Sequence, residues 1–324
     1  MNLKFTKPFI IAEIGNNHEG NLNNAIKLID KSKSAGADAV KFQTYKIENY
    51  ISRSQPERYK RLRKFQLSFS DFHQLQKYTH KKNMKFISTP LDLESANFLK
   101  KICDILKIAS GDNNYFQLIK NIFQSTKPII LSTGMTDMNE LKKTLQFINK
   151  IKGKNFLNSK FSLLHCIASY PTSFNEANIE TINTLKKLFK CQVGLSDHCR
   201  SNLPALVSLG MDVRIFEKHI TLSNDFSDFI DHKVALNPKD FGNYVQSIRN
   251  AFLTIGKARE KIFNSEKNTL TNNRRSLYAK KNITKGQKVD NSNSLALRPH
   301  KKSSININKL NIIAKKNYKV NVEI

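Results

Sequence analysis

The sequence predicts an α/β fold: a (β/α)8 TIM barrel followed by a small β-rich module. Short apolar stretches alternate eight times with helix-like stretches before Gly256. The apolar stretches are rich in isoleucine, as buried parallel strands are, and they end in polar side chains. Parallel strands need crossover helices, and eight such units close a barrel of about 250 residues. We therefore expect a barrel domain at 1–256, a linker at 257–273 and a further domain at 274–324.

Eight strands are expected, at 9–13, 39–43, 85–88, 105–108, 128–131, 161–165, 192–195 and 213–216. The main helices are expected at 23–35, 70–83, from 92, 115–123, 141–151, 179–189 and 238–255. Gly36 stops the first of these helices, and Asp137 with Glu140 three residues later indicates a variant of the capping box. The polar stretch 48–64 is long for a connection, and we interpret it as an active-site flap. In the last domain, strand-like pieces are expected at 276–279, 283–287 and 295–298.

The composition is that of a globular protein. The chain has 324 residues, of which 39% are hydrophobic, which is enough for a large core. No run approaches the roughly 20 apolar residues of a membrane span, and the first residues lack the apolar core of a signal peptide. We therefore expect a cytoplasmic protein with no membrane association.

The net charge and the cysteines exclude fewer classes of function than the hydrophobic content does. A net charge of +28 is compatible with nucleic acid or an anionic surface as partner. However, the lysines are scattered and no aromatic-interleaved basic stripe is present, so we favour a lysine-rich bias on solvated helix faces. The cysteines form no CxxC pair. We expect Cys103, Cys166 and Cys191 to be buried, inert thiols.

Two histidines follow neighbouring strands of the predicted barrel. His198 comes after the strand at 192–195, and His219 after the strand at 213–216. Adjacent parallel strands that each end in an imidazole direct both rings to one point above the sheet, which favours a metal site. A structural role remains the alternative for either histidine alone.

The other strand ends carry groups that suit an anion. Lys41 and Lys107 lie inside apolar strands, where an unpaired charge is costly, so an anionic ligand is expected beside them. Serines and threonines at neighbouring strand ends supply the neutral donors that phosphate and carboxylate oxygens accept. Local capping is the alternative for any one serine, but it explains the whole set poorly.

These residues stand in motifs that resemble the sialic acid synthase family, which comprises N-acetylneuraminate synthases and their legionaminate and pseudaminate relatives. The resemblance runs from Phe9 to about Pro238 and rests on Glu13-Ile14-Gly15, Asn17-His18-Glu19-Gly20, Lys41-Phe42-Gln43-Thr44, Ile87-Ser88-Thr89-Pro90, Lys107-Ile108-Ala109-Ser110-Gly111-Asp112, Ile130-Leu131-Ser132-Thr133-Gly134-Met135, Leu164-His165-Cys166, Tyr170-Pro171 and Gly194-Leu195-Ser196-Asp197-His198. The tail resembles an abbreviated form of the family's antifreeze-like SAF domain, through Arg274-Arg275-Ser276-Leu277-Tyr278, Ile283-Thr284-Lys285-Gly286 and Leu297-Arg298-Pro299.

The resemblance implies a transferase that condenses phosphoenolpyruvate (PEP) with a 2-acetamido hexose such as N-acetylmannosamine and releases phosphate. It implies a divalent cation, Mn²⁺ or Mg²⁺, and a domain-swapped homodimer in which the partner's SAF domain supplies an arginine. Carried over by motif, the catalytic residues are Glu13, His198 and His219, and the two histidines are the metal ligands. The PEP-binding residues are Lys41, Thr89, Lys107, Ser110, Ser132 and Ser196. The sugar-binding residues are Gln43, Asp112, Tyr170, Asp231 and Arg298.

Departures from the family pattern leave the acceptor sugar open. Asp112 stands where glutamate is usual, and Ala168 where asparagine is frequent. A second hypothesis is therefore a legionaminate or pseudaminate synthase that uses a 2,4-diacetamido-trideoxy hexose. A third, from another class, is an inactive basic binding protein, against which the intact Glu13, Lys41 and Lys107 argue.

Overall fold

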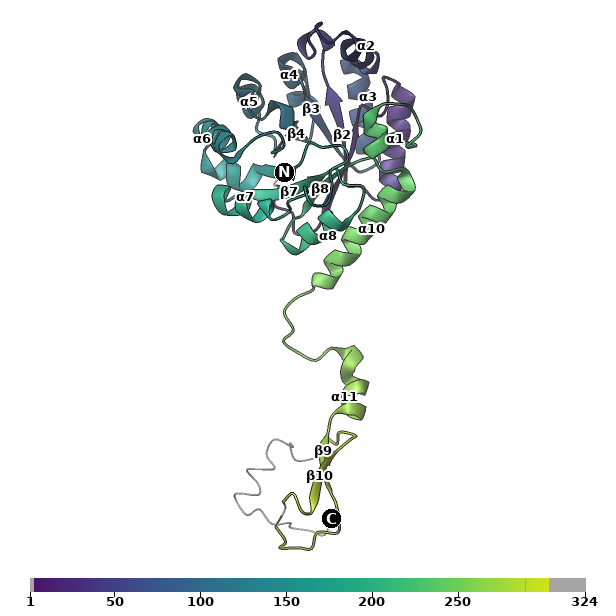
Figure 1. Ribbon diagram of the computed structural model, residues 1–324, viewed down its shortest axis with the longest axis vertical. Coiled ribbons are helices and arrows are strands. Elements are labelled where there is room, and N and C mark those ends of the chain that lie inside the picture. Colours follow the sequence, from purple (N-terminus) through teal and green to yellow (C-terminus); the bar gives the residue numbers. More distant parts are fainter. Residues whose placement is uncertain (1–2, 289, 303–324) are drawn as a thin grey trace. The chain divides into compact units, whose positions relative to one another are not determined.

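The chain folds into two compact units, Met1–Gly256 and Lys257–Ile324, and its computed structural model describes residues 3–288 and 290–302. The first unit contains a closed barrel of eight parallel strands in sequential order, which confirms the predicted fold (Figure 1). The strands are β1 Phe9–Gly15, β2 Ala39–Thr44, β3 Lys85–Pro90, β4 Ile105–Ile108, β5 Ile129–Ser132, β6 Phe161–Cys166, β7 Gln192–Asp197 and β8 Ile215–His219. The last strand begins two residues later than expected and includes His219.

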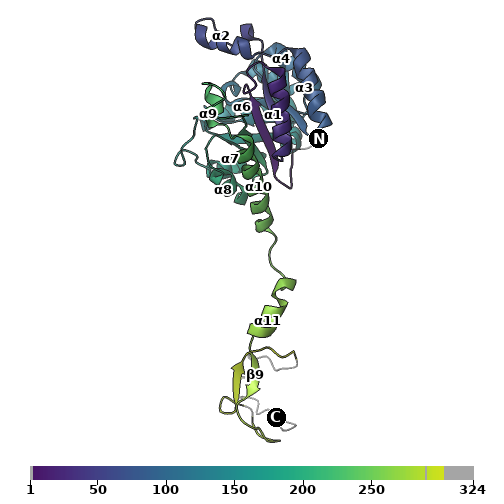
Figure 2. The ribbon, with the colours of Figure 1, turned by 90° about the vertical axis from the view of Figure 1, so that its right-hand side faces the viewer.

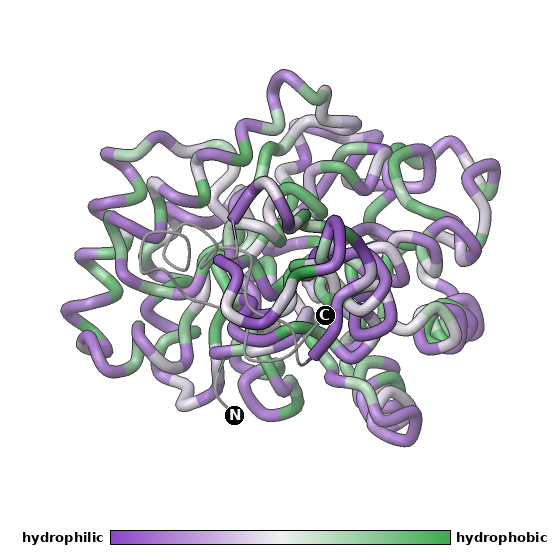
Figure 3. Tube along the Cα trace, turned by 90° about the horizontal axis from the view of Figure 1, so that it is seen from below, coloured by the Kyte–Doolittle hydropathy of each residue, from purple (hydrophilic) through white to green (hydrophobic). Residues whose placement is uncertain are grey.

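Helices surround these strands. They are α1 Leu22–Ser34, α3 Phe69–Lys81, α4 Leu93–Ile102, α5 Phe116–Phe123, α6 Met138–Lys160, α7 Thr181–Phe189, α8 Leu203–Gly210, the short α9 Ile230–Val234 and α10 Pro238–Ile255. Side chains such as Asn21, Ser68 and Asp92 accept a hydrogen bond from a first-turn amide and so fix where the helices begin. Hydrophilic and hydrophobic residues alternate along the helices in Figure 3, as expected for helices with one buried face.

Two helical regions differ from the sequence prediction. The stretch expected as a flap contains a 3₁₀ turn, η1 Ile47–Asn49, and a helix, α2 Pro56–Phe65, which in Figure 2 lies beyond the end of α1. Most of α2 is charged, but Leu62 and Phe65 are buried. Helix α6 extends past the expected 141–151, with a break at Gly153, where φ is 73°.

The barrel strands have two faces of different composition. One face packs on the surrounding helices, and the other fills the barrel interior. At the amino-terminal end of the strands, the interior is closed by an apolar floor of Phe9, Ile11, Ala39, Ile87, Ile105, Ile130, Leu164 and Ile215, with Leu3 and Phe5 packed against it. In β7 the corresponding position is Gly194, where an added Cβ would lie 2.5 Å from Leu164 Cδ2 and 2.6 Å from the Ile215 carbonyl oxygen. Glycine is therefore required for the floor to close.

The second unit begins with helical turns. The stretch expected as a linker contains η3 Asn264–Glu266 and α11 Lys267–Asn273. Strands β9 Ser276–Ala279 and β10 Ser294–Leu297 follow and pair in antiparallel fashion, close to where two strands were expected. The piece at 283–287 forms a turn, in which the Gln287 amide donates to the Thr284 carbonyl. The remainder of the predicted module, 303–324, lies outside the described residues.

No helix in the part of the chain that the structure describes is both long enough and apolar enough to cross a membrane.

Candidate active site

A polar ring lies directly above the apolar floor. Because side chains alternate along a strand, the residue two positions after each floor residue also faces the interior. These positions are occupied by Glu13, Lys41, Thr89, Lys107, Ser132, Cys166, Ser196 and Glu217, and all eight are buried. The ring thus carries two carboxylates, two ammonium groups, three hydroxyls and a thiol in the centre of the barrel.

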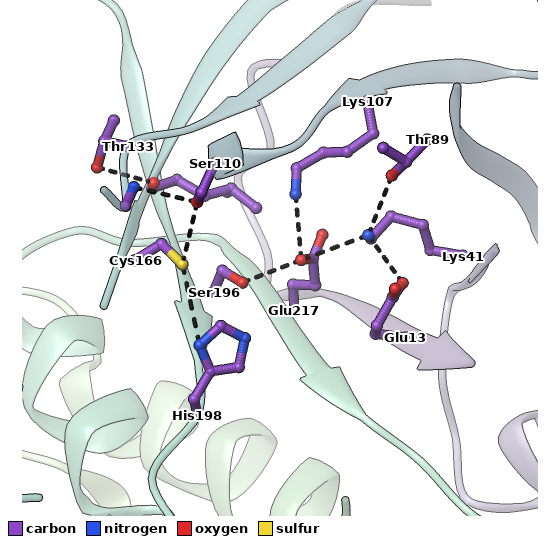
Figure 4. Close-up of polar contacts among 12 residues, drawn as sticks. Glu13, Lys41, Thr89, Lys107, Ser110, Thr133, Cys166, Ser196, His198 and Glu217 are labelled. Atoms are coloured by element: carbon purple, nitrogen blue, oxygen red, sulfur yellow. Dashed lines mark hydrogen bonds and ion pairs between the residues drawn. The ribbon is translucent and has the colours of Figure 1, made fainter. Parts of the chain in front are cut away.

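Glu217 contacts three other residues of this ring. Its Oε1 lies 3.0 Å from Ser196 Oγ, 3.2 Å from Lys107 Nζ and 3.7 Å from Lys41 Nζ (Figure 4). Glu217 was not among the site residues predicted from the sequence. Its place two residues after Ile215 in β8 was the signal that could have found it. We call Lys41, Lys107 and Ser196 the anion cradle, because their donors converge on this one carboxylate.

The two carboxylates of the ring differ in proton affinity. Lys41 Nζ lies 2.8 Å from Glu13 Oε2 and donates to Thr89 Oγ1 at 3.3 Å. Burial nevertheless outweighs the lysine and raises the pKa of Glu13 to about 7. Burial also acts to raise the pKa of Glu217, but Lys107 and Lys41 together lower it to about 2. Glu13 can therefore exchange a proton near neutral pH, whereas Glu217 is a lasting anion.

His198 and His219 lie next to each other at the rim, with ring centroids 5.5 Å apart. The Ile167 carbonyl oxygen lies 2.8 Å from His198 Nδ1. Since a carbonyl only accepts, Nδ1 carries a proton, and Nε2 is the ring nitrogen left to bind a metal. Burial, together with the nearby His198 and Lys41, lowers the pKa of His219 well below its usual value, so that ring is neutral. Buried His219 Nδ1 has no hydrogen-bond partner among the described residues.

This pair fits a divalent cation. Neutral imidazoles with a free lone pair are metal donors, and two of them leave coordination positions for water and substrate. Within residues 3–288 and 290–302, no group of three or more histidine, cysteine, aspartate or glutamate side chains is placed to hold a metal ion.

Cys166 belongs to the site, although the sequence suggested an inert thiol. Its Sγ lies 3.9 Å from His198 Nδ1 and 3.5 Å from Ser110 Oγ. Burial acts to raise the pKa of the thiol, but His198 and Ser110 lower it below the usual value. Ser110 also accepts a hydrogen bond from the Gly134 amide, at 3.1 Å. Buried Ser132 Oγ has no hydrogen-bond partner among the described residues and so can still donate to a ligand.

The predicted sugar-binding residues of the barrel lie farther along the strands than the ring. A Cβ added at Gly15 would lie 3.1 Å from Glu13 Oε1, 3.7 Å from Gln43 Nε2 and 3.8 Å from Asp231 Oδ2, so these groups surround one small space. Gly15 has φ of 53°, which also favours glycine. The ring of Tyr170 lies 4.3 Å from that of His198, between centroids. Gln43, Asp231 and Tyr170 are thus grouped near Glu13 and the histidines.

Asp112 reaches the same region near Tyr50. Burial raises the pKa of Tyr50, Arg58 opposes that effect, and the charges of Asp112 and Asp231 add to it. Both acids therefore lie near Tyr50, which was not among the predicted site residues. Burial raises the pKa of Asp112, and that of Asp231, to about 6.

Arg298 is the one predicted site residue that belongs to the second unit. It is exposed within that unit, and its Nε donates to the Asn273 carbonyl at 2.6 Å.

A buried ion pair on the outer face of the barrel fixes the strand ends that carry the histidines. Lys218 Nζ lies 2.9 Å from Asp197 Oδ2, and both side chains are 1% exposed. Lys218 also donates to the Cys199 carbonyl and lies over the ring of Tyr244 in α10. Since Asp197 precedes His198 and Lys218 precedes His219, this pair holds β7 and β8 together where the two imidazoles begin.

A barrel with buried ion pairs, an anion cradle and paired histidines at the carboxyl end of its strands has the features of an enzyme active site. The chain belongs to the NeuB family, whose family model matches residues 28–260. This confirms the resemblance to sialic acid synthases.

Named relatives agree with this assignment. The chain is 36% identical to the N,N'-diacetyllegionaminic acid synthase of Campylobacter jejuni, over 90% of this chain and 91% of that protein. It is 31% identical to the pseudaminic acid synthase of the same species, over 90% of this chain and 88% of that protein. The solved N-acetylneuraminic acid synthetase of Leptospira borgpetersenii superposes with a TM-score of 0.72 at 29% identity, covering 83% of this chain and 95% of that one.

Proposed function

We propose that this chain is a nonulosonic acid synthase that joins PEP to the aldehyde carbon of a 2-acetamido hexose and releases phosphate. The observation that carries the proposal is the polar ring, where two buried lysines and Ser196 converge on one point and Glu13 titrates near neutral pH. PEP brings a carboxylate and a phosphate, which are the anions that such donors bind. Membership of a family whose named relatives are synthases supports the same reaction.

In this proposal the ring holds PEP with its third carbon facing the rim. Lys41 and Lys107 neutralise its negative charge, while Ser196, Ser132, Ser110 and Thr89 supply neutral donors. A divalent cation bound by His198 and His219, Mn²⁺ or Mg²⁺, would supply Lewis acidity to the aldehyde. Gln43, Asp112, Asp231 and Tyr170 orient the acceptor sugar.

Proton transfer is the task of Glu13. The electron pair of the PEP double bond forms the new bond to the aldehyde carbon, and protonated Glu13 gives its proton to the aldehyde oxygen. Water adds at the second carbon of PEP and gives a proton to Glu13, whose pKa of about 7 suits a general base. The bond from that carbon to the phosphate oxygen then breaks, and the new hydroxyl passes its proton to the departing phosphate, which leaves a keto group and free phosphate.

The acceptor sugar has two candidates. N-acetylmannosamine is the simplest 2-acetamido hexose for this reaction. A 2,4-diacetamido-trideoxy hexose is favoured by the 36% identity to the diacetyllegionaminic acid synthase. We further propose a homodimer whose SAF-like unit brings Arg298 to the partner's sugar, and a cytoplasmic location, where PEP is produced.

The proposal is tested by phosphate release from PEP and Mn²⁺ with a panel of hexoses, with Glu13→Gln as the inactive control. We expect release with one class of 2-acetamido hexose and none without an acceptor. If no sugar supports release and the chain instead binds polyanions with steep salt dependence, it is a basic binding protein.

A further inference from the structure

The donors of the anion cradle are already engaged in the free protein. Glu217 Oε1 accepts from Ser196 Oγ at 3.0 Å and from Lys107 Nζ at 3.2 Å, and it lies 3.7 Å from Lys41 Nζ. Figure 4 shows this carboxylate between the two lysines and the serine. These three residues are among those that bind PEP in the proposed function. Before PEP enters, an anion of the protein itself therefore occupies its donors.

Only one of the two oxygens of the Glu217 carboxylate takes part in these contacts. Glu217 is 5% exposed, and its Oε2 has no hydrogen-bond partner among the described residues. A buried carboxylate with one unused oxygen is held less firmly than one with both oxygens bonded. Its three contacts converge on Oε1, so a modest rotation of the side chain would release all of them together.

Lys107 depends on this contact more than Lys41 does. Within the described part of the chain, Glu217 is its single ion-pair partner, whereas Lys41 also pairs with Glu13 at 2.8 Å. Without Glu217, the ammonium group of Lys107 in an empty site would be buried with no direct ion-pair partner, which is strongly unfavourable. Any bound anion would then be held harder and released more slowly.

We propose that Glu217 is a resident counter-anion of the anion cradle, which yields Lys107 and Ser196 to the anionic substrate and reclaims them as phosphate leaves. The inference rests on the proposed function. Competition from Glu217 weakens phosphate binding and so speeds turnover, and in the empty site the same carboxylate keeps Lys107 charged and in place. Glu217 is in this view a positioning residue that controls anion affinity.

The test is Glu217→Gln, which keeps the size of the side chain and a hydrogen-bond acceptor for Ser196 but removes the charge. Affinity for inorganic phosphate is measured by calorimetry on the full chain, and thermal unfolding is followed with and without phosphate. Glu94→Gln, at the exposed first turn of α4, is the matched control because it changes the net charge equally, away from the cradle.

We expect Glu217→Gln to bind phosphate about tenfold more tightly than the wild type, a change of about 1.4 kcal/mol. We also expect it to melt lower without phosphate, gain more from added phosphate, and show stronger phosphate inhibition against PEP. Glu94→Gln should match the wild type. If Glu217→Gln fails to fold without phosphate, Glu217→Asp withdraws the carboxylate from Lys107 by one methylene and should show a smaller gain.

A purely structural role for Glu217 predicts that Glu217→Gln lowers stability with no gain in phosphate affinity. That result would overturn the inference about Glu217 but leave the proposed function unaffected. PEP and phosphate binding by the wild type, lost in Lys107→Met, supports the proposed function separately. If the wild type binds neither anion, the proposed function fails, and the inference fails with it.

Discussion

Replacing Lys107 by methionine tests the centre of the proposed site most directly. The side chain is buried in β4, with its Nζ 3.2 Å from Glu217 Oε1. Methionine fills a similar volume but cannot neutralise an anion. A hydrogen bond to a charged group contributes about 1.5–3 kcal/mol, so we expect the apparent Michaelis constant for PEP to rise about 10- to 100-fold, with that for the sugar little changed.

The same substitution removes one partner of a buried ion pair. Leaving a buried charge uncompensated typically costs about 3–5 kcal/mol, and the value here should fall at the low end because Ser196 and Lys41 still contact Glu217. The double variant Lys107→Met/Glu217→Gln removes both charges. It should therefore recover most of the lost stability, with a coupling energy well above that of unrelated sites.

The assay combines phosphate release over a PEP titration with unfolding in urea. Lys85→Met is the matched control, because Lys85 is also a strand lysine but is 48% exposed and 3.6 Å from Asp104. An exposed pair contributes at most about 1 kcal/mol, so this control should keep its PEP constant and nearly all of its stability. An unchanged PEP constant in a folded Lys107→Met variant would show that the lysine serves the barrel and not the substrate.

Four further outcomes are expected. His219→Gln should keep the circular dichroism spectrum but lose Mn²⁺ binding and metal-dependent turnover; full activity in chelator-treated buffer would contradict the metal site. Asp112→Asn should raise the free energy of unfolding by about 1–2 kcal/mol at pH 8 but not at pH 3. Burial raises the pKa of Asp112 to about 6, so above that pH the folded state contains an unfavourable buried charge, and below the pKa of the unfolded state it does not. Equal gains at both pH values would refute this reasoning. Gly194→Ala should cost about 1–3 kcal/mol in urea unfolding, from overpacking of the apolar floor; unchanged stability would mean that the floor can yield. Arg298→Ala should raise the Michaelis constant for the sugar alone, and mixing it with Glu13→Gln should restore one working site per dimer; no recovery after verified subunit exchange would contradict swapped units.

Much of the barrel could be predicted because its strands are short and apolar and each is followed by an amphipathic helix. The lysines of β2 and β4 were informative for the same reason, since a charge inside an apolar strand requires an anion. The histidine pair followed from strand adjacency, and the structure places the two rings 5.5 Å apart. Helix α2 was missed because its composition is that of a solvated segment and just Leu62 and Phe65 are buried.

Glu217 and Cys166 were missed for a geometric reason. The strands of a barrel are staggered, so residues at one level lie at different distances from the ends of their strands. Ser132 is the last residue of β5, whereas Glu217 is the third of five in β8. Inspecting strand ends therefore finds the first and overlooks the second. Cys166 closes β6 one residue past the predicted strand, so the sequence alone did not show which face it occupies.

The apolar floor closes the barrel at the amino-terminal end of the strands, so substrates can enter the interior from the carboxyl end. Leu3 and Phe5 pack across the closed end, and the floor residues have almost no contact with solvent. In the proposed site PEP binds deeper in the barrel, and the sugar binds nearer the open end. Binding and release are then ordered: PEP must bind before the sugar, and phosphate can leave only after the nine-carbon product has dissociated. The kinetic order of this enzyme would thus follow from a layer of isoleucines that touches neither substrate.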